Sequence, residues 1–334
     1  MTNLEIQDVE RIAALDYDWK KLDGKTVLMS GGTGFIGQFL INVFKCRNES
    51  YGNDIGVISC SRRPLPSERN VRYIGHDITK PFEPDCKIDC ILHLASNTHP
   101  KQYSSDPVGT ITTNIFGTYN LLTLAARCKA ERFLLASSVE IYGDGGDAPM
   151  SEAYCGYIDC NTARAGYNEA KRLSESLCQS FIAQYGIDCV TVRLARCFGA
   201  DKKDDSKAMA QFMKCALNGE NIVLKSKGEQ RFSYCYVADA ASGIIKVLLD
   251  GECGNAYNIS DDDEDMTLGG YAAFIAKLAG REVVFDLSGT DNKGVSKSAR
   301  ALIDTSKLKS LGWKPQYAVS EALARTYEIL KNGK

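Results

Sequence analysis

The chain alternates between two kinds of hydrophobic pattern along its N-terminal part. Between Leu4 and Leu15 the apolar residues recur mostly at three- and two-residue intervals on one helical face, which predicts a short amphipathic helix. Residues Thr26–Ser30 form a short β-rich run, and a glycine-rich turn follows it directly. Helical character returns at Phe39–Phe44. The pattern therefore predicts a strand, a glycine turn and a helix, in that order.

The same alternation continues further along the chain. Runs typical of strands are separated by helical segments in most places, and they occupy Ile55–Cys60, Val71–Ile74, Cys90–Leu94, Arg132–Ala136 and Cys189–Leu194. Strands that are joined by helices form right-handed βαβ units. We therefore expect an α/β fold built on a doubly wound parallel sheet.

The alternation loosens from about Phe198 onward. The pattern predicts a helix at Ala208–Asn218, a strand at Ile222–Lys225 and a helix at Ala238–Leu249, with Lys- and Asp-rich turns before them. We expect residues 1–197 to form the main domain with a short N-terminal helical extension. Residues 198–334 are then mainly a smaller C-terminal α/β lobe, with some segments returning to the main domain.

Composition, net charge and cysteine count exclude some classes of function. The chain has 334 residues, 44% of them hydrophobic and 25% charged, so it is able to bury a core. Its net charge of −2 argues against a nucleic-acid partner, which needs an excess of Lys and Arg. The 13 cysteines are odd in number and scattered, and Cys86 and Cys90 lack a second pair. We expect reduced thiols, no metal, no membrane segment and a cytoplasmic location.

The glycine turn has the spacing of a dinucleotide site. Gly31, Gly34 and Gly37 lie three apart between the first strand and the first long helix. They suit a tight turn, close approach of the backbone to a pyrophosphate, and close packing of helix on strand, as in the Rossmann fold. The helix N-terminus adds N–H donors for the phosphates.

Two arginines stand where an NAD site usually has an acid. The end of the second strand reads Ser61-Arg62-Arg63, and guanidinium groups suit the 2′-phosphate of NADP. The alternative is a pair of solvent-exposed arginines in a loop. Asp77, after the third strand, is a candidate for the adenine amino group or for capping a turn.

Tyr167 and Lys171 are four residues apart in a helical stretch, so both side chains lie on one face. An ammonium beside a phenol stabilises the phenolate, which can then remove a proton from an alcohol while hydride leaves the same carbon. Such a pair also occurs by chance in many helices. The upstream glycine turn is what favours the catalytic interpretation.

Several further motifs accompany these residues. They are His93-Leu94-Ala95-Ser96, Asn114 with Gly117, Ala136-Ser137-Ser138, Tyr142-Gly143 and Tyr236-Val237 with Asp239. With the glycine turn and the Tyr/Lys pair, they resemble the extended short-chain dehydrogenases/reductases of the nucleotide-sugar epimerase/dehydratase family. The resemblance covers nearly the whole chain. It implies an enzyme with NADP or NAD, a nucleotide-sugar substrate between the two lobes, and a homodimer.

The resemblance also assigns roles to single residues. It implies that Ser138 hydrogen-bonds the reacting oxygen, that Tyr167 is the base and that Lys171 holds the nicotinamide ribose. It adds cofactor contacts from Phe35, Ile36, Ile78, Leu94, Ala95, Ser96 and Asn114.

Within this family the sequence looks most similar to UDP-glucuronate decarboxylases. The segment His93–Tyr103 resembles their segment after the fourth strand, Glu140 lies two residues after Ser138, and Arg164 lies three before Tyr167. We take Glu140 as a fourth catalytic residue. The candidate substrate-binding residues are Thr98, Tyr103, Arg164, Arg196 and Arg231.

The sequence departs from the family pattern on the substrate side. Val139 stands where dehydratases carry an acid, and Arg196 stands where the family usually has Asn near the nucleotide diphosphate. Arg231 lies five residues before Tyr236, whereas the family's arginine lies four before, where this chain has Phe232. A shift of one residue turns a strand side chain to the other face unless a bulge restores it.

These observations leave several reactions open after oxidation of the sugar at C4. Decarboxylation of UDP-glucuronate through a 4-keto intermediate is our first expectation, because it needs no acid at position 139. The alternatives are 4-epimerisation or 4,6-dehydration of a nucleotide sugar, a simple NADP-linked reductase, and a non-catalytic NADP-binding protein.

Overall fold

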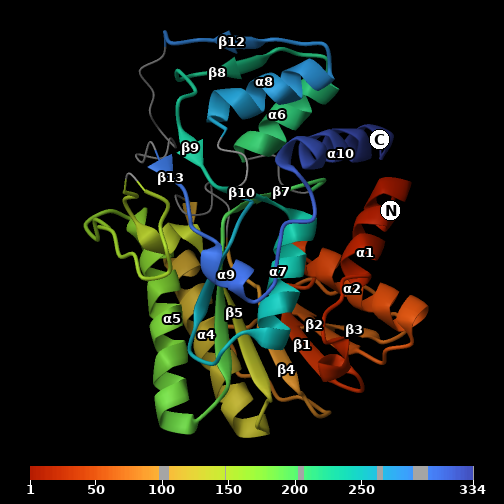
Figure 1. Cartoon of the computed structure of the whole chain (residues 1–334). Helices are drawn as coiled ribbons and strands as arrows, with labels where there is room; N and C mark the ends of the chain where they lie inside the picture. The colour runs from red at the N-terminus through yellow and green to blue at the C-terminus, as the bar shows by residue number, and fades with distance from the viewer. Residues whose placement is uncertain (98–104, 147, 202–206, 262–265, 289–299, 334) are drawn as a thin grey trace.

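The computed structural model describes residues 1–97, 105–146, 148–201, 207–261, 266–288 and 300–333. In these residues, seven strands form a parallel sheet with the order β11-β6-β5-β4-β1-β2-β3 (Figure 1). The strands are β1 Thr26–Ser30, β2 Gly56–Ser61, β3 Val71–Gly75, β4 Cys90–His93, β5 Arg132–Ser138, β6 Cys189–Leu194 and β11 Ala256–Ile259. The order runs outward in both directions from β1 and β4, which confirms the doubly wound α/β fold.

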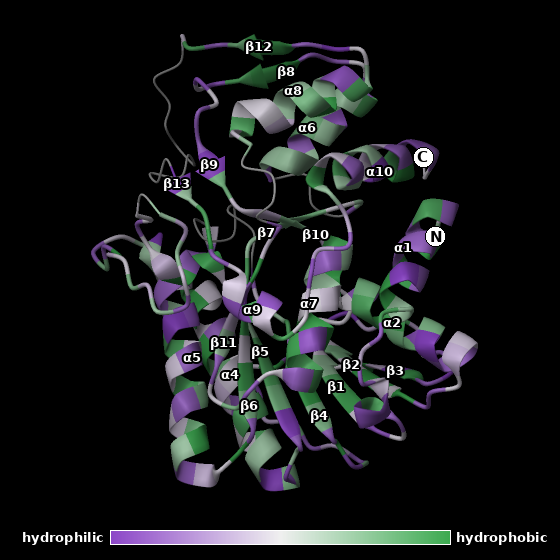
Figure 2. Ribbon diagram, in the orientation of Figure 1, coloured by the Kyte–Doolittle hydropathy of each residue, from purple (hydrophilic) through white to green (hydrophobic). Residues whose placement is uncertain are grey.

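Helices cover both faces of this sheet. The long ones are α2 Phe35–Tyr51, α4 Pro107–Cys128, α5 Ala165–Tyr185 and α7 Val237–Asp250. Alternate strand residues point to opposite faces: Val27 and Met29 belong to the core with α2 and α7, whereas Leu28 packs with α4 and α5. Because both faces are buried, the strands read as nearly continuous apolar runs, which Figure 2 shows in green.

The N-terminal helix α1, Asn3–Ala13, packs against α2 and α7. Thr2 and Glu5 form a capping box at its start. Asp8, which is buried, accepts hydrogen bonds from Tyr236 (2.5 Å) and from Arg325 of the C-terminal helix (2.8 Å). A short 3₁₀ helix, η1 Trp19–Leu22, connects α1 to β1. Helix α1 therefore connects α2 and α7, which cover the main sheet, to Arg325 in the C-terminal helix.

A smaller α/β layer lies above the carboxyl ends of the large sheet (Figure 1). It contains α6 Ala208–Leu217, β8 Ile222–Leu224, α8 Leu268–Leu278, β12 Val283–Phe285 and α10 Val319–Asn332. Two short parallel pairs, β7 Arg196–Phe198 with β10 Tyr234–Tyr236 and β9 Arg231–Phe232 with β13 Arg300–Ala301, lie between the layers. The remaining short helices are η2 Val139–Tyr142 and α9 Ser306–Ser310.

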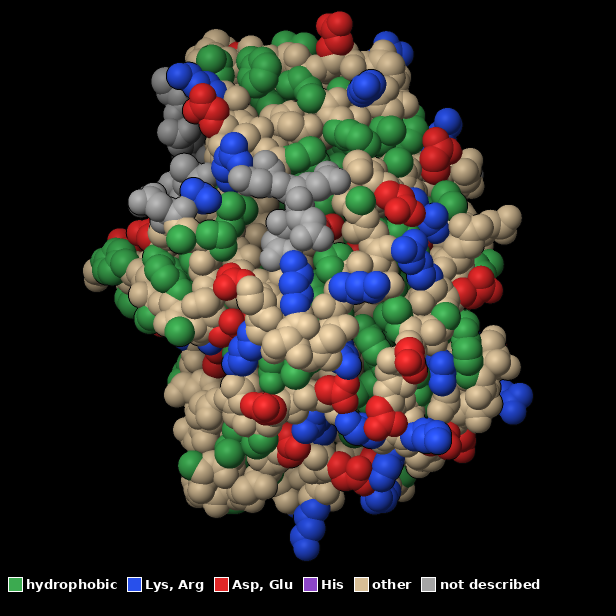
Figure 3. Space-filling model, in the orientation of Figure 1, with side chains coloured by type: hydrophobic (Ala, Val, Ile, Leu, Met, Phe, Trp, Pro, Cys, Tyr) green, Lys and Arg blue, Asp and Glu red, His purple; other side chains and the backbone are tan. Residues whose placement is uncertain are grey.

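The surface carries both signs of charge. On the face shown in Figure 3, Lys and Arg side chains lie among Asp and Glu side chains. Of the helices within the described ranges, none combines the length and the apolar character that a membrane span needs. In the same residues, no group of three or more His, Cys, Asp or Glu side chains is arranged to hold a metal ion.

Candidate active site

The glycine turn connects β1 to α2 at the carboxyl edge of the sheet. Gly31 has φ +78°, and a side chain there would lie 2.8 Å from the backbone nitrogen of Ala95. A side chain on Gly37 would reach the carbonyl oxygen of Gly31 and lie 2.7 Å from Cα of Gly32. Gly34 is the N-cap of α2 and brings no capping side chain. Phe35 and Ile36 open the helix, so its free N–H groups can receive a phosphate.

The next two strands end beside this turn. Arg62 and Arg63 are exposed, and the Ser61 hydroxyl donates to the carbonyl of Arg63 (3.0 Å). Asp77 accepts hydrogen bonds from the backbone (3.0 Å) and hydroxyl (2.9 Å) of Thr79, and these bonds, followed by the nearby Arg62 charge, lower its pKa. Asp77 therefore does cap a turn, and it lies close enough to Arg62 to interact with it.

The segment after β4 packs directly on the glycine turn. The backbone N–H groups of Leu94 and Ala95 donate to the carbonyl (3.1 Å) and hydroxyl (3.3 Å) of Ser30. Ser30 also bonds the buried His93 (2.7 Å), and burial lowers the pKa of His93 to about 3. His93 is thus a neutral packing residue at ordinary pH.

Helix α4 holds the other side of this segment. Ser96 donates to the side-chain oxygen of Asn114 (2.8 Å), whose amide donates to the carbonyl of Thr110 (2.8 Å). Ile78 packs against Gly117, where a side chain would collide with it. These contacts fix the backbone around the position that a nicotinamide dinucleotide would occupy.

Ser138, Tyr167 and Lys171 come together where β5 ends against α5. Tyr167 is buried, which raises its pKa to about 12, although hydrogen bonds with Ser138 and Ser96 act in the opposite direction. The Lys171 ammonium lies 6.0 Å from the centre of the Tyr167 ring and donates to the carbonyl of Ala136 (2.8 Å). Burial lowers the Lys171 pKa to about 8. At neutral pH the phenol is therefore protonated and the amine mostly charged.

Glu140 lies beside these residues in η2, between two arginines. Its carboxylate accepts from Arg164 (2.8 Å) and, at 3.5 Å, from Arg196. Its backbone N–H donates to the Ser138 hydroxyl (3.2 Å). Asn168, which the sequence interpretation missed, donates to the Glu140 carbonyl (2.7 Å) and bonds Arg164 (2.9 Å). Its position next to Tyr167 and four after Arg164 is the signal that could have found it.

The structure does not bring the remaining candidate substrate-binding residues to Glu140 and Ser138 among the residues it describes. Arg231 begins the short strand β9 and pairs with Arg300, while the next residue, Phe232, has the Arg196 guanidinium 4.0 Å above its ring centre. Successive strand side chains point to opposite faces, so Arg231 faces away from the side on which Phe232 meets Arg196. Thr98 and Tyr103 lie outside the described residues.

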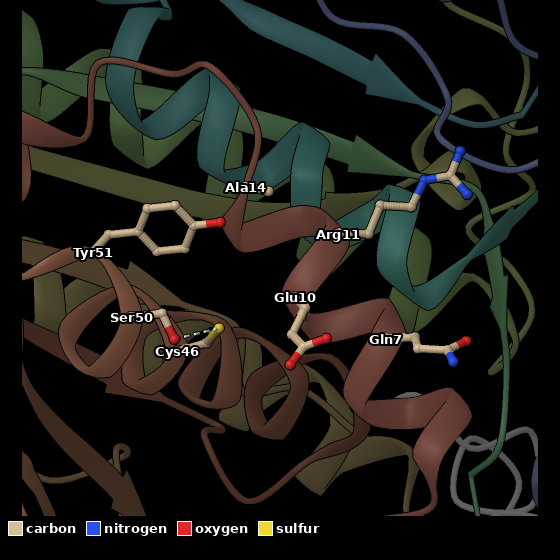
Figure 4. A pocket seen from close by; sticks show the side chains of 7 residues that line it. All are labelled: Gln7, Glu10, Arg11, Ala14, Cys46, Ser50 and Tyr51. Atoms are coloured by element: carbon tan, nitrogen blue, oxygen red, sulfur yellow. Dashed lines mark hydrogen bonds between the residues drawn. The ribbon is translucent and has the colours of Figure 1, made fainter.

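A shallow groove of about 450 Å³ lies elsewhere, between α1 and the C-terminal half of α2. Figure 4 shows Glu10 and Arg11 on one side, and Tyr51 and Cys46 on the other, with Cys46 directed at Ser50. Cys46 is eleven residues beyond Phe35 in α2, about 16 Å along the helix axis. The groove is therefore separate from the site around Tyr167.

Comparison with known proteins agrees with this geometry. Residues 27–260 match the model of the NAD dependent epimerase/dehydratase family, which is well over half of the chain. The chain belongs to this family of enzymes. The glycine turn and the Ser138, Tyr167 and Lys171 cluster all lie inside the matched range. The family supplies the expectation of a nicotinamide cofactor and a nucleotide-sugar substrate.

Individual relatives in this epimerase/dehydratase family are similar over most of their length. The chain is 31% identical to UDP-glucuronic acid decarboxylase 1 of Xenopus tropicalis, covering 98% of this chain and 78% of the relative. It is 33% identical to UDP-glucuronic acid decarboxylase 3 of Arabidopsis thaliana, covering 89% and 86%. A solved structure of UDP-glucose 4-epimerase from Thermotoga maritima matches with TM-score 0.78 at 22% identity, over 92% of this chain and 99% of that one.

Proposed function

We propose that this protein removes the carboxyl group of UDP-glucuronate through a 4-keto intermediate. The observation that carries the proposal is the placement of Glu140 and two guanidinium groups directly beside Ser138, which is hydrogen-bonded to Tyr167. The similarity to UDP-glucuronic acid decarboxylases over nearly the whole chain supports it. Val139 supports it further, because it offers no acid to protonate a leaving hydroxyl.

The reaction balances when the hydride taken from C4 is held by a bound nicotinamide and returned, and when one proton from solvent replaces carbon dioxide at C5. Removal of hydride from C4 and of the proton from its hydroxyl gives a ketone, and the carboxylate on C5 is then β to that ketone. The bond from C5 to the carboxyl carbon breaks, carbon dioxide leaves, and the electron pair forms an enolate. Protonation at C5 and return of the hydride to C4 give a pentose.

The residues of this chain have separate roles in that sequence. Ser138 would orient the C4 oxygen. Tyr167 would take and return its proton, which requires the phenolate form that burial disfavours here. Lys171, charged below about pH 8, favours the phenolate and holds the cofactor ribose. Positioned acid–base groups typically contribute about 10²- to 10⁴-fold to a rate.

A nicotinamide dinucleotide fits the glycine turn, because Gly31 and Gly37 pack against backbone too closely for a Cβ, and the uncapped start of α2 at Gly34 offers free N–H groups to a phosphate. When bound, it supplies the acceptor and donor of the hydride at C4. Gly31, Gly34 and Gly37 would face its pyrophosphate, and Asn114 with Ser96 would lie along the segment beside the nicotinamide. We propose NADP over NAD, because Arg62 and Arg63 end the second strand in place of an acid.

The decisive test is to incubate the purified protein with a panel of nucleotide sugars and to read product masses. Loss of carbon dioxide from UDP-glucuronate is the expected result. An unchanged mass with altered retention would mean epimerisation, and loss of water would mean dehydration. Recovery of intact UDP-glucuronate while a neutral UDP- or dTDP-hexose is converted would exclude the decarboxylase.

We also propose that the protein is a homodimer that pairs through α4 and α5. The outward faces of these helices expose four large apolar side chains, Phe116, Tyr119, Leu173 and Tyr185, each between 44% and 55% accessible. Large exposed apolar side chains on two neighbouring helices are typical of an association site. Light scattering on the native protein should give about twice the monomer mass, and Phe116→Asp with Leu173→Asp should give the monomer.

A further inference from the structure

Arg196 is held by contacts that leave part of its guanidinium without a partner. The group lies over the Phe232 ring, with its central carbon 4.0 Å from the ring centre. One terminal nitrogen, Nη2, is 3.5 Å from a carboxylate oxygen of Glu140. The other, Nη1, is buried and has no hydrogen-bond partner among the residues that the structure describes.

A buried N–H of a cation is costly to leave without an acceptor. Leaving a buried donor unsatisfied typically costs about 1 to 3 kcal/mol, and more when the group is charged. Nη1 therefore marks a position where an anionic or carbonyl oxygen would be stabilised. The Phe232 ring and Glu140 hold the planar group, so its remaining donor is aimed before any ligand arrives.

The charges around Glu140 do not cancel. Arg164 and Arg196 bring two positive charges to one carboxylate, so the cluster retains one net positive charge. Arg164 is 53% exposed and uses its two terminal nitrogens on Asn168 and Glu140, whereas the Arg196 side chain is only 25% exposed. Arg196 is thus the less solvated of the two cations, and the better one for selecting an anion.

A short chain of contacts connects the reacting position to Arg196. The C4 oxygen must lie within hydrogen-bond reach of both Ser138 and Tyr167. Glu140 is bonded to Ser138 through its backbone, and Arg196 is bonded to Glu140 through its side chain. A uronate carries its carboxylate on C5, next to C4, so a sugar that presents C5 toward Glu140 brings that carboxylate to the Arg196 side of the site.

We propose that Arg196 is the residue that selects a uronate over a neutral hexose, by donating from Nη1 to the sugar carboxylate. Phe232 is a positioning residue that fixes the plane of the guanidinium. This inference rests on the proposed function, since it concerns recognition of that substrate. It assigns Arg196 to the carboxylate rather than to the diphosphate.

The test measures binding, not turnover, with three ligands that share the same diphosphate. Calorimetry with UDP-glucuronate, UDP-glucose and UDP-xylose compares a carboxylate, a hydroxymethyl group and a hydrogen at C5. For Arg196→Gln we expect the dissociation constant of UDP-glucuronate to rise about 10- to 100-fold, which is about 1.4 to 2.7 kcal/mol, with the other two changed less than threefold. Arg196→Lys should recover part of the affinity, because it keeps the charge but loses the planar donor set.

The controls separate the possible failures. Arg281→Gln removes an exposed arginine of the upper lobe and should leave all three affinities unchanged. Equal weakening of all three ligands by Arg196→Gln, in a variant with an unchanged melting curve, would place Arg196 on the diphosphate and overturn the inference. Retained preference for UDP-glucuronate in that variant would overturn it too. If the unaltered protein binds UDP-glucuronate no better than UDP-glucose, selection by Arg196 is overturned, whereas the proposed function is judged separately by loss of carbon dioxide from UDP-glucuronate.

Discussion

The two sides of the site differ in how their side chains are held. Tyr167 and Lys171 are at most 5% exposed, and their partners are hydroxyl and carbonyl groups of the surrounding strands. Glu140, Arg164 and Arg196 are 25% to 53% exposed and are held mainly by one another's charges. Proton transfer needs a fixed, dry geometry, whereas an ionic cluster at the edge of water can be rebuilt by single substitutions. The Tyr/Lys pair therefore lies on the dry side of the site, and Arg196 lies on the side nearer water.

The largest effect should come from the buried side. In Tyr167→Phe the ring remains but the proton acceptor is lost, so we expect turnover to fall about 10²- to 10⁴-fold or more. The removed hydroxyl is buried beside Ser138, and a melting curve will show whether the fold is kept. Product formation from UDP-glucuronate at saturating substrate is the measurement. Turnover within about threefold of the unaltered protein would contradict the assignment of Tyr167 as the base.

The second prediction uses the buried amine on the same side. The Lys171 pKa is about 8 in the folded protein and near 10.4 in an unfolded chain. Between these values the unfolded state binds more protons, so stability rises with pH by up to about 3 kcal/mol. Below about pH 8 Lys171 is protonated in both the folded and the unfolded state, so its contribution to the free energy of unfolding does not change with pH. Relative to Lys171→Met, the unaltered protein should therefore gain stability between pH 8 and 10.

Urea unfolding of both proteins at pH 6, 7, 7.5, 8, 9 and 10 checks this prediction. The pH 6 to 7.5 interval serves as the internal control, because no change in the difference is expected there. A difference that stays constant up to pH 10 would show that the amine is not desolvated. The buried side would then resemble the ionic side more closely than the structure indicates.

The third prediction concerns the glycine turn. Gly37→Ala places a methyl group against the Gly31 carbonyl and 2.7 Å from Cα of Gly32, where backbone must move. We expect a loss of about 1 to 3 kcal/mol in stability and weaker dinucleotide binding. Gly56→Ala is the matched control, because its nearest atoms are 3.6 Å away and its φ is unstrained. Equal behaviour of the two variants in melting and cofactor titration would remove the packing argument.

Much of the main domain could be predicted from the sequence, and less of the upper lobe. Strands β1 to β6 are four to seven residues long and mostly buried. Their apolar runs can therefore be recognised in the amino-acid sequence. The pairs β7 with β10 and β9 with β13 are two or three residues long and exist only through contacts between distant segments. Helices α8 and α10, and strand β11, were also missed. No local pattern specifies which of these short segments meet.

The site shows the same division. Tyr167 and Lys171 follow from their spacing on one helix and Ser138 from the family resemblance, and the structure brings the three together. The stacking of Arg196 on Phe232 joins residues from different strands, and the sequence alone could not show that the two unusual positions touch. Arg231 was a candidate because it lies one residue before the place of the family's arginine, and strand alternation turns it to the other face from Phe232.

The smallest effect is expected at the end of β2, where the proposed contact with the cofactor is also ionic and exposed. Arg62 and Arg63 are both exposed at the end of β2, and Arg62 already interacts with Asp77. That acid competes with a 2′-phosphate for the guanidinium, so the preference for NADP should be moderate.

We expect Arg62→Ala to weaken the binding of NADP about tenfold, or about 1.4 kcal/mol, and to leave the binding of NAD unchanged. Calorimetry with both dinucleotides measures this, and Arg69→Ala, an exposed arginine in the same connection, is the control. Tenfold tighter binding of NAD by the unaltered protein, or release of NAD alone on denaturation, would show that the two arginines are solvated loop residues.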